Sequence, residues 1–401
     1  MATTITAGNA TNGAAISSDN TGILELKSGT GSGTTAVTVS TGQNVTFAQA
    51  ANLPNTFGFK NRIINGAMVI DQRNAGASVS LSTGSLAYPV DRSGAIITQG
   101  SGHTGQRSTV APAGFVNSLL ITVGTGASPT AGQISRIYQG IEGVNVADLG
   151  WGTANAQTIT LSFWVRSSLT GTFAGGVYNG DSNRTYVFTY SISSANTWEQ
   201  KTVTIAGDTS GSWNTGNGAG MYVNWDLGTG STYQGTAGVW AAGAAWATSG
   251  SVKLAATSGA TFYITGITLE KGSTATSFDY RPYGTELQLC QRYCYQVTSV
   301  GGTDGFVRYA VGECTSTTLV DSVIPFPVQM RVTPSLTTPA ASQFAATSSP
   351  IAGTAIALLA GSGVNTAGVR LTVASGLTLG RAAQLMSNNN NTSYLLFSSE
   401  L

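Results

Sequence analysis

Charged residues are scarce in this 401-residue chain. Asp, Glu, Lys and Arg together make up 9% of it, and the formal net charge is +1. Soluble domains average about 25% charged residues. A soluble protein with so few charges covers exposed β faces with Ser, Thr, Asn and Gly, or hides surface in permanent interfaces. Because no Lys and Arg cluster interleaves with aromatic residues, we expect no nucleic-acid partner.

Signals for export and for membranes are also lacking. The start, MATTITAGNATNG, has neither a basic segment nor an apolar run, so it does not read as a signal peptide. Apolar stretches such as IAGTAIALLAGSGV are broken by glycine and fall short of the about 18 continuous apolar residues of a membrane span. We therefore expect no membrane insertion.

Histidine and cysteine are rare. The single histidine, His103, stands in the glycine-rich run QGSGHTGQ, where an ordinary loop residue is expected. The glycines of this run match GxGxxG, but the following RSTVAPAG does not begin a helix, so no phosphate site is predicted. Cys290 and Cys294 have no histidine or third thiol nearby, which favours buried free thiols over a metal or redox pair.

The first 56 residues contain short strand-like runs, ILELK, TAVTVS and NVTFA, separated by Gly, Ser and Thr. Strands this short become stable when several chains each add one to a shared shaft. A disordered tail is the alternative. We prefer an N-terminal shaft or virion-attachment segment over residues 1–56. The apolar residues that such a shaft would bury are Ile23, Leu24, Leu26, Val37, Val39, Val45 and Phe47.

Residues 57–283 carry many strand-like runs between Gly and Asn turns, from NRIINGAMVID to TFYITGITLE, and few helix signals. This pattern predicts a β-sandwich of the jelly-roll type. In QTITLSFWVRS the alternation gives one core face, and Trp164 and Arg166 point away from it. The residues expected on that core face are Ile159, Leu161, Phe163 and Val165. The last run is a strand interrupted at Gly266.

The hydrophobic period lengthens after this last strand. Four apolar residues recur at spacings of three, four and three, which predicts one face of a short helix over residues 284–298. Thr285 and Gln288 supply a capping box at its start. A helix this short needs a partner for its apolar stripe, either the flanking domains or copies of itself. The stripe residues are Leu287, Cys290, Cys294 and Val297.

Residues 299–401 again contain strand-like runs, including FVRYAVGE, VRLTVAS and SYLLFSSEL. They predict a C-terminal β domain.

Three segments resemble a known family. NRIINGAMVIDQRNAG, AYPVDRSG and ITLEKGSTATSFDYRPYGTELQLCQRYCYQ are similar to bacteriophage virion proteins identified as tail fibres. The resemblance covers residues 58–298 and implies a jelly roll similar to carbohydrate-binding modules, a short helix and a C-terminal β domain. One departure is Asp91-Arg92-Ser93, where the family often has Asp-Arg-Trp. Because such fibres are usually homotrimers, the resemblance places the apolar helix stripe near a threefold axis.

The tryptophans are clustered: all seven lie between Trp151 and Trp246. Exposed aromatic rings on rigid loops bind sugars by stacking, while core or interface packing is the alternative for such rings. We expect Trp164 and Trp198 to be structural, and Trp213 and Tyr233 to be the most exposed. The candidate glycan-binding residues are Trp213, Tyr222, Trp225, Tyr233, Trp240 and Trp246.

Signals for catalysis are weak. No HExxH or P-loop motif is present, and a Ser-His-Asp site could use only His103. Asp181, Asp208 and Asp226 are expected in polar loops of the sandwich, where two carboxylates could cleave a glycosidic bond if they converged across a groove. Solvated loop acids or one structural Ca²⁺ site are the more ordinary explanations. We therefore expect no catalytic residues, no enzymatic activity, no cofactor and no metal site, with a structural Ca²⁺ left open.

Taken with the resemblance, the sequence predicts an all-β, elongated, homotrimeric fibre of a phage virion, made in the bacterial host cytoplasm. Its N-terminus would attach it to other virion proteins, and it would contribute to host attachment by binding a surface glycan. A purely structural head, collar or neck fibre without a receptor site is the first alternative. A glycan-degrading virion enzyme is the second.

Overall fold

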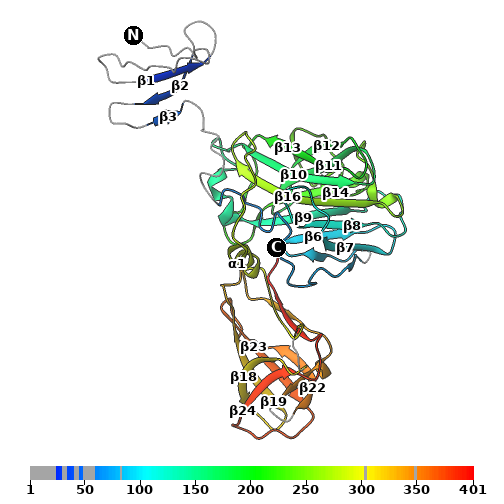
Figure 1. The fold of residues 1–401 in the computed structure, drawn as a ribbon, viewed down its shortest axis with the longest axis vertical. Helices are drawn as coiled ribbons and strands as arrows, with labels where there is room; N and C mark the ends of the chain where they lie inside the picture. Colours follow the sequence, from blue (N-terminus) through cyan, green and yellow to red (C-terminus); the bar gives the residue numbers. More distant parts are fainter. Residues whose placement is uncertain are drawn as a thin grey trace, which may run out of the picture. The chain divides into compact units, whose positions relative to one another are not determined.

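The computed structural model describes residues 24–28, 34–39, 45–47, 59–81, 84–301, 305–346 and 350–401. This part of the chain is nearly all β, with a single α-helix (Figure 1). It divides into two compact units, Met1–Thr56 and Phe57–Leu401.

The first unit holds one antiparallel sheet of three strands in the order β1-β2-β3. They are β1 (Leu24–Ser28), β2 (Thr34–Val39) and β3 (Val45–Phe47). All three predicted runs are therefore strands. Val37 is half-buried, and the burial expected of the other apolar side chains here lies outside the described residues, as does Ile23. The shaft itself stays a prediction.

The second unit begins with an antiparallel β-sandwich of the jelly-roll type, as predicted. In spatial order its six-stranded sheet consists of β13 (Glu199–Ile205), β10 (Ile159–Ser167), β16 (Thr261–Lys271), β8 (Ser118–Thr122), β7 (His103–Ser108) and β4 (Val79–Leu81). Its seven-stranded sheet consists of β15 (Trp240–Ala242), β12 (Arg184–Ile192), β11 (Gly171–Asn179), β14 (Ala219–Asp226), β9 (Ser135–Glu142), β6 (Ser93–Ile97) and β5 (Ala87–Val90). Single 3₁₀ turns connect some strands: η1 (Gly143–Asn145), η2 (Ala147–Leu149), η3 (Ser231–Tyr233) and η4 (Leu254–Ala256).

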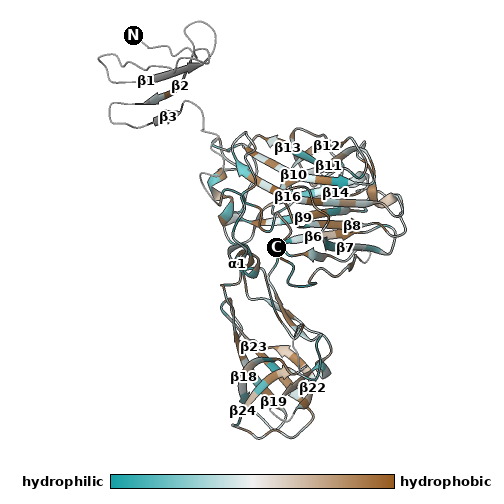
Figure 2. Ribbon diagram, viewed as in Figure 1, coloured by the Kyte–Doolittle hydropathy of each residue, from teal (hydrophilic) through white to brown (hydrophobic). Residues whose placement is uncertain are grey.

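Strand alternation builds the core between the two sheets. On β10, the four residues predicted to share a face are at most 1% exposed, whereas Trp164 and Arg166 are half-buried on the opposite face. Hydrophobic and hydrophilic segments alternate along the sandwich strands in Figure 2. The alternation seen in the sequence therefore does separate core from surface.

Gly266 marks a β-bulge within one continuous strand. The register of β16 against β10 shifts between Ser162 and Trp164, and Gly266 has φ +61°. A Cβ at this position would lie 2.6 Å from the ring of Phe115. The predicted interruption is thus confirmed as a bulge, at a place where only glycine fits.

The segment NRIINGAMVID was predicted as a strand, and this is wrong. Residues 61–71 form bends and turns, with Asn65 at φ +60°. Oδ1 of Asn61 accepts hydrogen bonds from the N–H groups of Ile63 and Leu269, each at 3.0 Å. Oδ1 of Asn65 accepts from the N–H of Ile70 at 2.9 Å. Asparagine amides thus take the place of a strand partner for this backbone.

The observed helix is shorter than the helix that the apolar stripe predicted. Helix α1 (Tyr283–Gln291) begins after Pro282, whose side chain makes no capping hydrogen bond, so the capping box of Thr285 and Gln288 is wrong. Strand β17 (Cys294–Thr298) starts three residues after the helix and pairs with β25 (Tyr394–Ser398). Cys294 and Val297 therefore lie on a strand, and the four-residue helical stripe is a wrong prediction.

Helix α1 already has a partner within its own chain. Cys290 and Tyr293 are fully buried and pack with Ile64 and Ile70 of the turn segment. Of the two partners that the sequence left open, the flanking domain covers this side of the helix. A threefold axis near Leu287 stays a prediction.

The C-terminal part is β, as predicted. A closed barrel is formed by β18 (Arg308–Cys314), β19 (Leu319–Pro325), β23 (Thr366–Val373), β22 (Ile351–Leu358), β21 (Phe344–Ala346) and β24 (Ala382–Ser387). A small sheet, β17-β25-β20, packs against the hydrophobic core of this barrel, with β20 at Ser335–Thr337 and η5 at Ala341–Gln343. Closure leaves this barrel without a free sheet edge.

Candidate functional site

The outer face of the seven-stranded sheet carries aromatic side chains. On β11, Val177 enters the core and its neighbour Tyr178 faces outward. On β14, Val223 enters the core and Tyr222 faces outward. On β9, Ile137 lies in the core, which puts Tyr138 on the same outer face. Three adjacent strands thus present tyrosines on one surface.

These rings continue into a row that crosses the sheet, here called the outer-face row. Ring centroids lie 5.9 Å apart for Tyr138 and Tyr222, and 5.0 Å apart for Tyr222 and Tyr178, which are stacked. Tyr178 lies 5.5 Å from Trp246, and Trp246 stacks on Tyr233 at 4.8 Å. The outer-face row is therefore Tyr138, Tyr222, Tyr178, Trp246 and Tyr233.

Two rings of the row support the other three. Tyr178 is 2% exposed and Trp246 5%, whereas Tyr138, Tyr222 and Tyr233 are half-buried. A ligand on this face would contact the half-buried rings, while the buried pair fixes their positions. Rings fixed in this way lose little freedom when a ligand binds.

Arg136 lies at the centre of the row. Its guanidinium carbon is 4.1 Å from the ring centroid of Trp246, 5.2 Å from that of Tyr138 and 5.4 Å from that of Tyr178. Its Nη1 donates a hydrogen bond to the hydroxyl of Tyr178 at 2.9 Å. Burial raises the pKa of Tyr178, so this phenol stays neutral. Arg136 is held by cation–π contacts on several sides.

Small residues make room for the row. Gly140 follows Arg136 and Tyr138 in the outward set of β9, and a Cβ there would lie 2.9 Å from the ring of Tyr222. The same Cβ would lie 2.9 Å from Cβ of Leu401, which borders the row. A side chain at position 140 would therefore displace Tyr222.

Polar atoms without partners gather at this face. Nδ2 of Asn224 donates to the carbonyl of Gly176 at 2.9 Å, but its Oδ1 is buried and has no hydrogen-bond partner within the described residues. The same holds for Nε of Arg136 and Nε1 of Trp246. Buried polar groups in folded proteins are nearly always satisfied, so such a cluster marks a place where water or a ligand completes the bonding.

The six predicted glycan-binding residues separate into three groups. Tyr222, Tyr233 and Trp246 belong to the outer-face row. Trp225 is 1% exposed and lies in the core, 5.6 Å from the ring of Phe163, so the core alternative holds for it. The third group, Trp213 and Trp240, packs elsewhere.

Trp213 and Trp240 form a triad with Trp151 at the edge of the sandwich. The three ring centroids are 4.6, 5.2 and 5.6 Å apart, in edge-to-face contacts. Each indole N–H donates to a backbone carbonyl: Trp151 to Gln157, Trp213 to Ser210 and Trp240 to Ala206. This is structural packing. Trp213, like Tyr233, is only half-buried, so neither is the open ring that the sequence predicted.

Sequence reasoning missed Tyr138, Tyr178 and Arg136. The signal was available in SRIYQGIE and GTFAGGVYN, where alternation places these residues opposite the core. The clustering of the tryptophans instead led to the prediction of a site on loops. Trp164 and Trp198 are half-buried, in keeping with structural roles. The ring centroids of Trp198 and Tyr263 lie 6.0 Å apart.

Of the three acids expected in polar, solvated loops, Asp208 and Asp226 are buried and held in structural contacts, and Asp226 ends strand β14, which corrects the prediction for these two. Asp208 accepts from Nε and Nη2 of Arg184 at 2.8 and 2.7 Å. Asp226 accepts from the N–H groups of Gly228 and Thr229, whereas Asp181 is exposed. In the described ranges, no group of three or more His, Cys, Asp or Glu is placed to hold a metal ion.

His103 is not a loop residue, which corrects the sequence prediction. It begins β7 and is fully buried. Nδ1 accepts from the N–H of Gly124 at 3.2 Å, so Nε2 carries the proton and donates to the carbonyl of Gln99 at 2.7 Å. The GxGxxG match indeed leads into a strand and not into a helix. No helix in the described part of the chain has the length and apolar character to cross a membrane.

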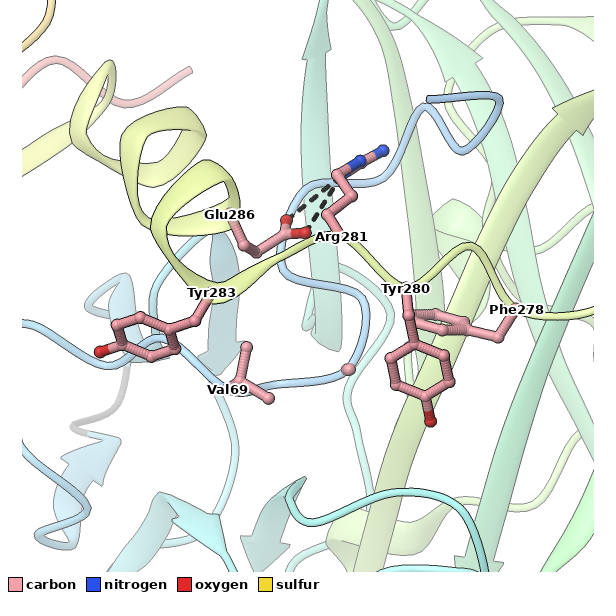
Figure 3. A pocket seen from close by; sticks show the side chains of 7 residues that line it. Val69, Phe278, Tyr280, Arg281, Tyr283 and Glu286 are labelled. Carbon is pink, nitrogen blue, oxygen red and sulfur yellow. Dashed lines mark hydrogen bonds and ion pairs between the residues drawn. The ribbon is translucent and has the colours of Figure 1, made fainter. Parts of the chain in front are cut away.

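A separate cavity of about 120 Å³ lies beside α1. It is lined by Ala67, Val69, Phe278, Tyr280, Arg281, Tyr283 and Glu286. Figure 3 shows Tyr283 on one side of Val69, Tyr280 and Phe278 on the other, and the Arg281–Glu286 ion pair between them. Arg281 also donates to the carbonyl of Ile63 at 3.2 Å, so this pair ties the turn segment to the helix. The ion pair therefore has a structural role.

Comparisons with known proteins give distant structural neighbours. No protein-family model and no curated protein matches the chain. Among solved structures, the enzymatically active domain of tailspike protein 4 of bacteriophage CBA120 aligns with 12% identity and TM-score 0.27, over 53% of this chain and only 22% of that one. TmCBM61 in complex with β-1,4-galactotriose aligns with 8% identity and TM-score 0.26, over 53% and 99%. The family 11 carbohydrate-binding module of Clostridium thermocellum, in complex with a β-1,3-1,4-mixed-linked tetrasaccharide, aligns with 9% identity and TM-score 0.26, over 52% and 100%. At these values the likeness carries no information on ligand or activity.

Proposed function

We propose that this protein is a non-enzymatic, homotrimeric fibre of a phage virion that contributes to host attachment by binding a surface glycan. The outer-face row carries the glycan-binding part of the proposal. Sugar rings have apolar faces that stack on aromatic rings, and polar groups beside the rings fix the hydroxyls. The row offers two half-buried tyrosines on a rigid sheet, Tyr138 and Tyr222, and a third, Tyr233, on the 3₁₀ turn η3. Arg136 lies over the ring of Tyr138.

The virion assignment rests on the resemblance of residues 58–298 to phage tail fibres. The scarcity of charge is consistent with a chain that hides surface in an assembly. A trimer would also present three copies of one weak site, and avidity would then strengthen attachment. A purely structural fibre is the second candidate, since rings packed this closely also suit a face covered by another protein.

The glycan site is tested by measuring binding of the purified chain to an array of bacterial surface oligosaccharides. Tyr222→Ala should weaken binding about tenfold or more, which corresponds to about 1.4 kcal/mol. Trp213→Ala is the matched control, because it removes a half-buried aromatic ring from the triad and leaves the row intact. Equal loss in both variants, or no loss in either, would remove the row from consideration. Absence of any binding favours the structural fibre, and release of reducing ends from the glycans would show an enzyme.

Assembly is tested by light scattering of the full chain. The expected mass is three times the 40.9 kDa of one chain. A monomer in dilute solution would contradict both the shaft over residues 1–56 and the trimer.

A further inference from the structure

The charge of Arg136 is not neutralised within the described residues. No carboxylate oxygen of that part of the chain lies within 4.0 Å of its guanidinium, whereas Arg73, Arg92 and Arg184 each have such a partner. Asp226 lies opposite Arg136 in the β-sheet register, but its carboxylate faces other donors, the N–H of Thr229 at 2.8 Å among them. The outer-face row therefore contains an uncompensated positive charge.

The guanidinium of Arg136 is also pre-oriented. Three rings contact it, and its Nη1 donates a hydrogen bond to the hydroxyl of Tyr178. Nη2 has no hydrogen-bond partner within the described residues, and the side chain is half-buried, so a ligand can reach it. A planar guanidinium binds carboxylates with particular strength, because charge assists the hydrogen bonds.

A second cation borders the row. Arg331 donates to the carbonyl oxygens of Ser399, Glu400 and Asn217, at 2.7, 2.8 and 3.2 Å. None of these oxygens carries a full negative charge. Burial raises the pKa of Tyr222, and Arg136 and Arg331 both act against that rise, so the two cations act on the same ring.

We propose that the outer-face row selects acidic glycans, with a sugar ring on Tyr222 or Tyr138 and its carboxylate on Nη2 of Arg136. This inference rests on the proposed glycan-binding function and adds the class of ligand to it. Arg136 makes the difference between acidic and neutral sugars. Arg331 raises the local positive potential without touching the ligand.

The experiment uses the full chain and oligosaccharides in matched pairs that differ only at C6, as galacturonate against galactose, glucuronate against glucose and mannuronate against mannose. The carboxylated member of at least one pair should bind about tenfold tighter or more, as charge-assisted hydrogen bonds require. Added salt should weaken this preference, because screening acts on the charge and not on the stacking.

Two variants locate the preference. Arg136→Gln should weaken the acidic members more than the neutral members, so that the preference disappears. Arg136→Lys should restore part of the preference, since the charge returns without the planar fork. Arg166→Gln is the matched control, because Arg166 lies 4.9 Å over the ring of Tyr263 on the other sheet. It should leave the preference unchanged. Near-ultraviolet circular dichroism checks that the rings of the row keep their packing.

Three outcomes would overturn the inference. Equal binding of acidic and neutral members, with loss in Tyr222→Ala, would reject the acidic class and leave glycan binding in place. Equal loss of acidic and neutral binding in Arg136→Gln would show that Arg136 only positions the rings. Absence of binding to every oligosaccharide would reject the inference together with the proposed function.

Discussion

The guanidinium of Arg92 donates to the carboxylate of Glu400, across 308 sequence positions. Arg92 is 2% exposed, and its guanidinium carbon lies 3.5 Å from the ring centroid of Tyr293. The other carboxylate oxygen of Glu400 accepts from Arg73 at 3.0 Å. The last residues of the chain are therefore anchored to the sandwich, next to helix α1. The contacts of Glu400 with Arg92 and Arg73 form what is here called the joint.

Replacing Glu400 by alanine should destabilise this joint strongly. The change leaves Arg92 buried without its carboxylate, and breaking a buried ion pair costs about 3 to 5 kcal/mol. Urea denaturation followed by tyrosine and tryptophan fluorescence measures the loss. Asp148→Ala is the control, because the Arg62–Asp148 pair is 24% and 48% exposed and should contribute under about 1 kcal/mol. Equal effects of the two variants would contradict the anchoring role.

Asp91 should make stability depend on pH. Burial raises its pKa to about 6, although Gln72 and Arg73 both donate to it. Between the ordinary 3.8 and about 6, the folded chain keeps a proton that the unfolded chain releases. The free energy of unfolding therefore falls as the pH rises through this window. Above the window, the stabilisation that came from the proton on Asp91 is lost.

Asp91→Asn should abolish this part of the pH dependence. The free energy of unfolding of the natural chain should fall by roughly 1 to 3 kcal/mol relative to the variant between pH 4 and pH 6. Urea titrations at several pH values measure the difference. Parallel curves for the two proteins would show that Asp91 titrates in its usual range.

The sequence predicted those parts of the fold that depend on local alternation. QTITLSFWVRS gave the core face of β10 correctly, because period two needs no knowledge of a distant partner. The extent of the helix was wrong because Cys294–Thr298 pairs with Tyr394–Ser398, a contact that no local pattern reveals. The spacing of apolar residues in the short run CYQV fits both a helix and a strand, so the sequence could not decide between them.

The candidate site was predicted only in part for the same reason. Tyr222, Tyr233 and Trp246 were named from composition, yet Trp213 and Trp240 were named by the same argument and belong to a structural triad. Which rings meet depends on the register of β9, β11 and β14. Arg136 and Tyr178 are 42 positions apart, and only the folded sheet brings them together.

Trp213→Ala should lower stability without changing the ligand site. The variant loses two edge-to-face contacts, with Trp151 and Trp240, each worth about 0.5 to 1.5 kcal/mol beyond burial. We expect these two contacts to account for about 2 kcal/mol of the loss in thermal or urea unfolding, and the lost burial of the ring adds to it. Trp198→Ala is the control, since Trp198 has one ring contact, to Tyr263, and should cost less. A larger loss for Trp198 would mean that the triad contributes little.

The three thiols report separately on the joint and on the barrel. Cys290, Cys294 and Cys314 are free and at most 1% exposed. Burial raises the pKa of Cys290 and Cys294, which keeps both as unreactive neutral thiols. A maleimide should therefore label none of the three in the native chain and all three in denaturant. In Glu400→Ala we expect local opening of the joint, so Cys290 and Cys294 should label first, while Cys314 stays protected in the barrel core. Labelling of all three thiols at one common rate would instead show that the joint opens only when the whole unit unfolds.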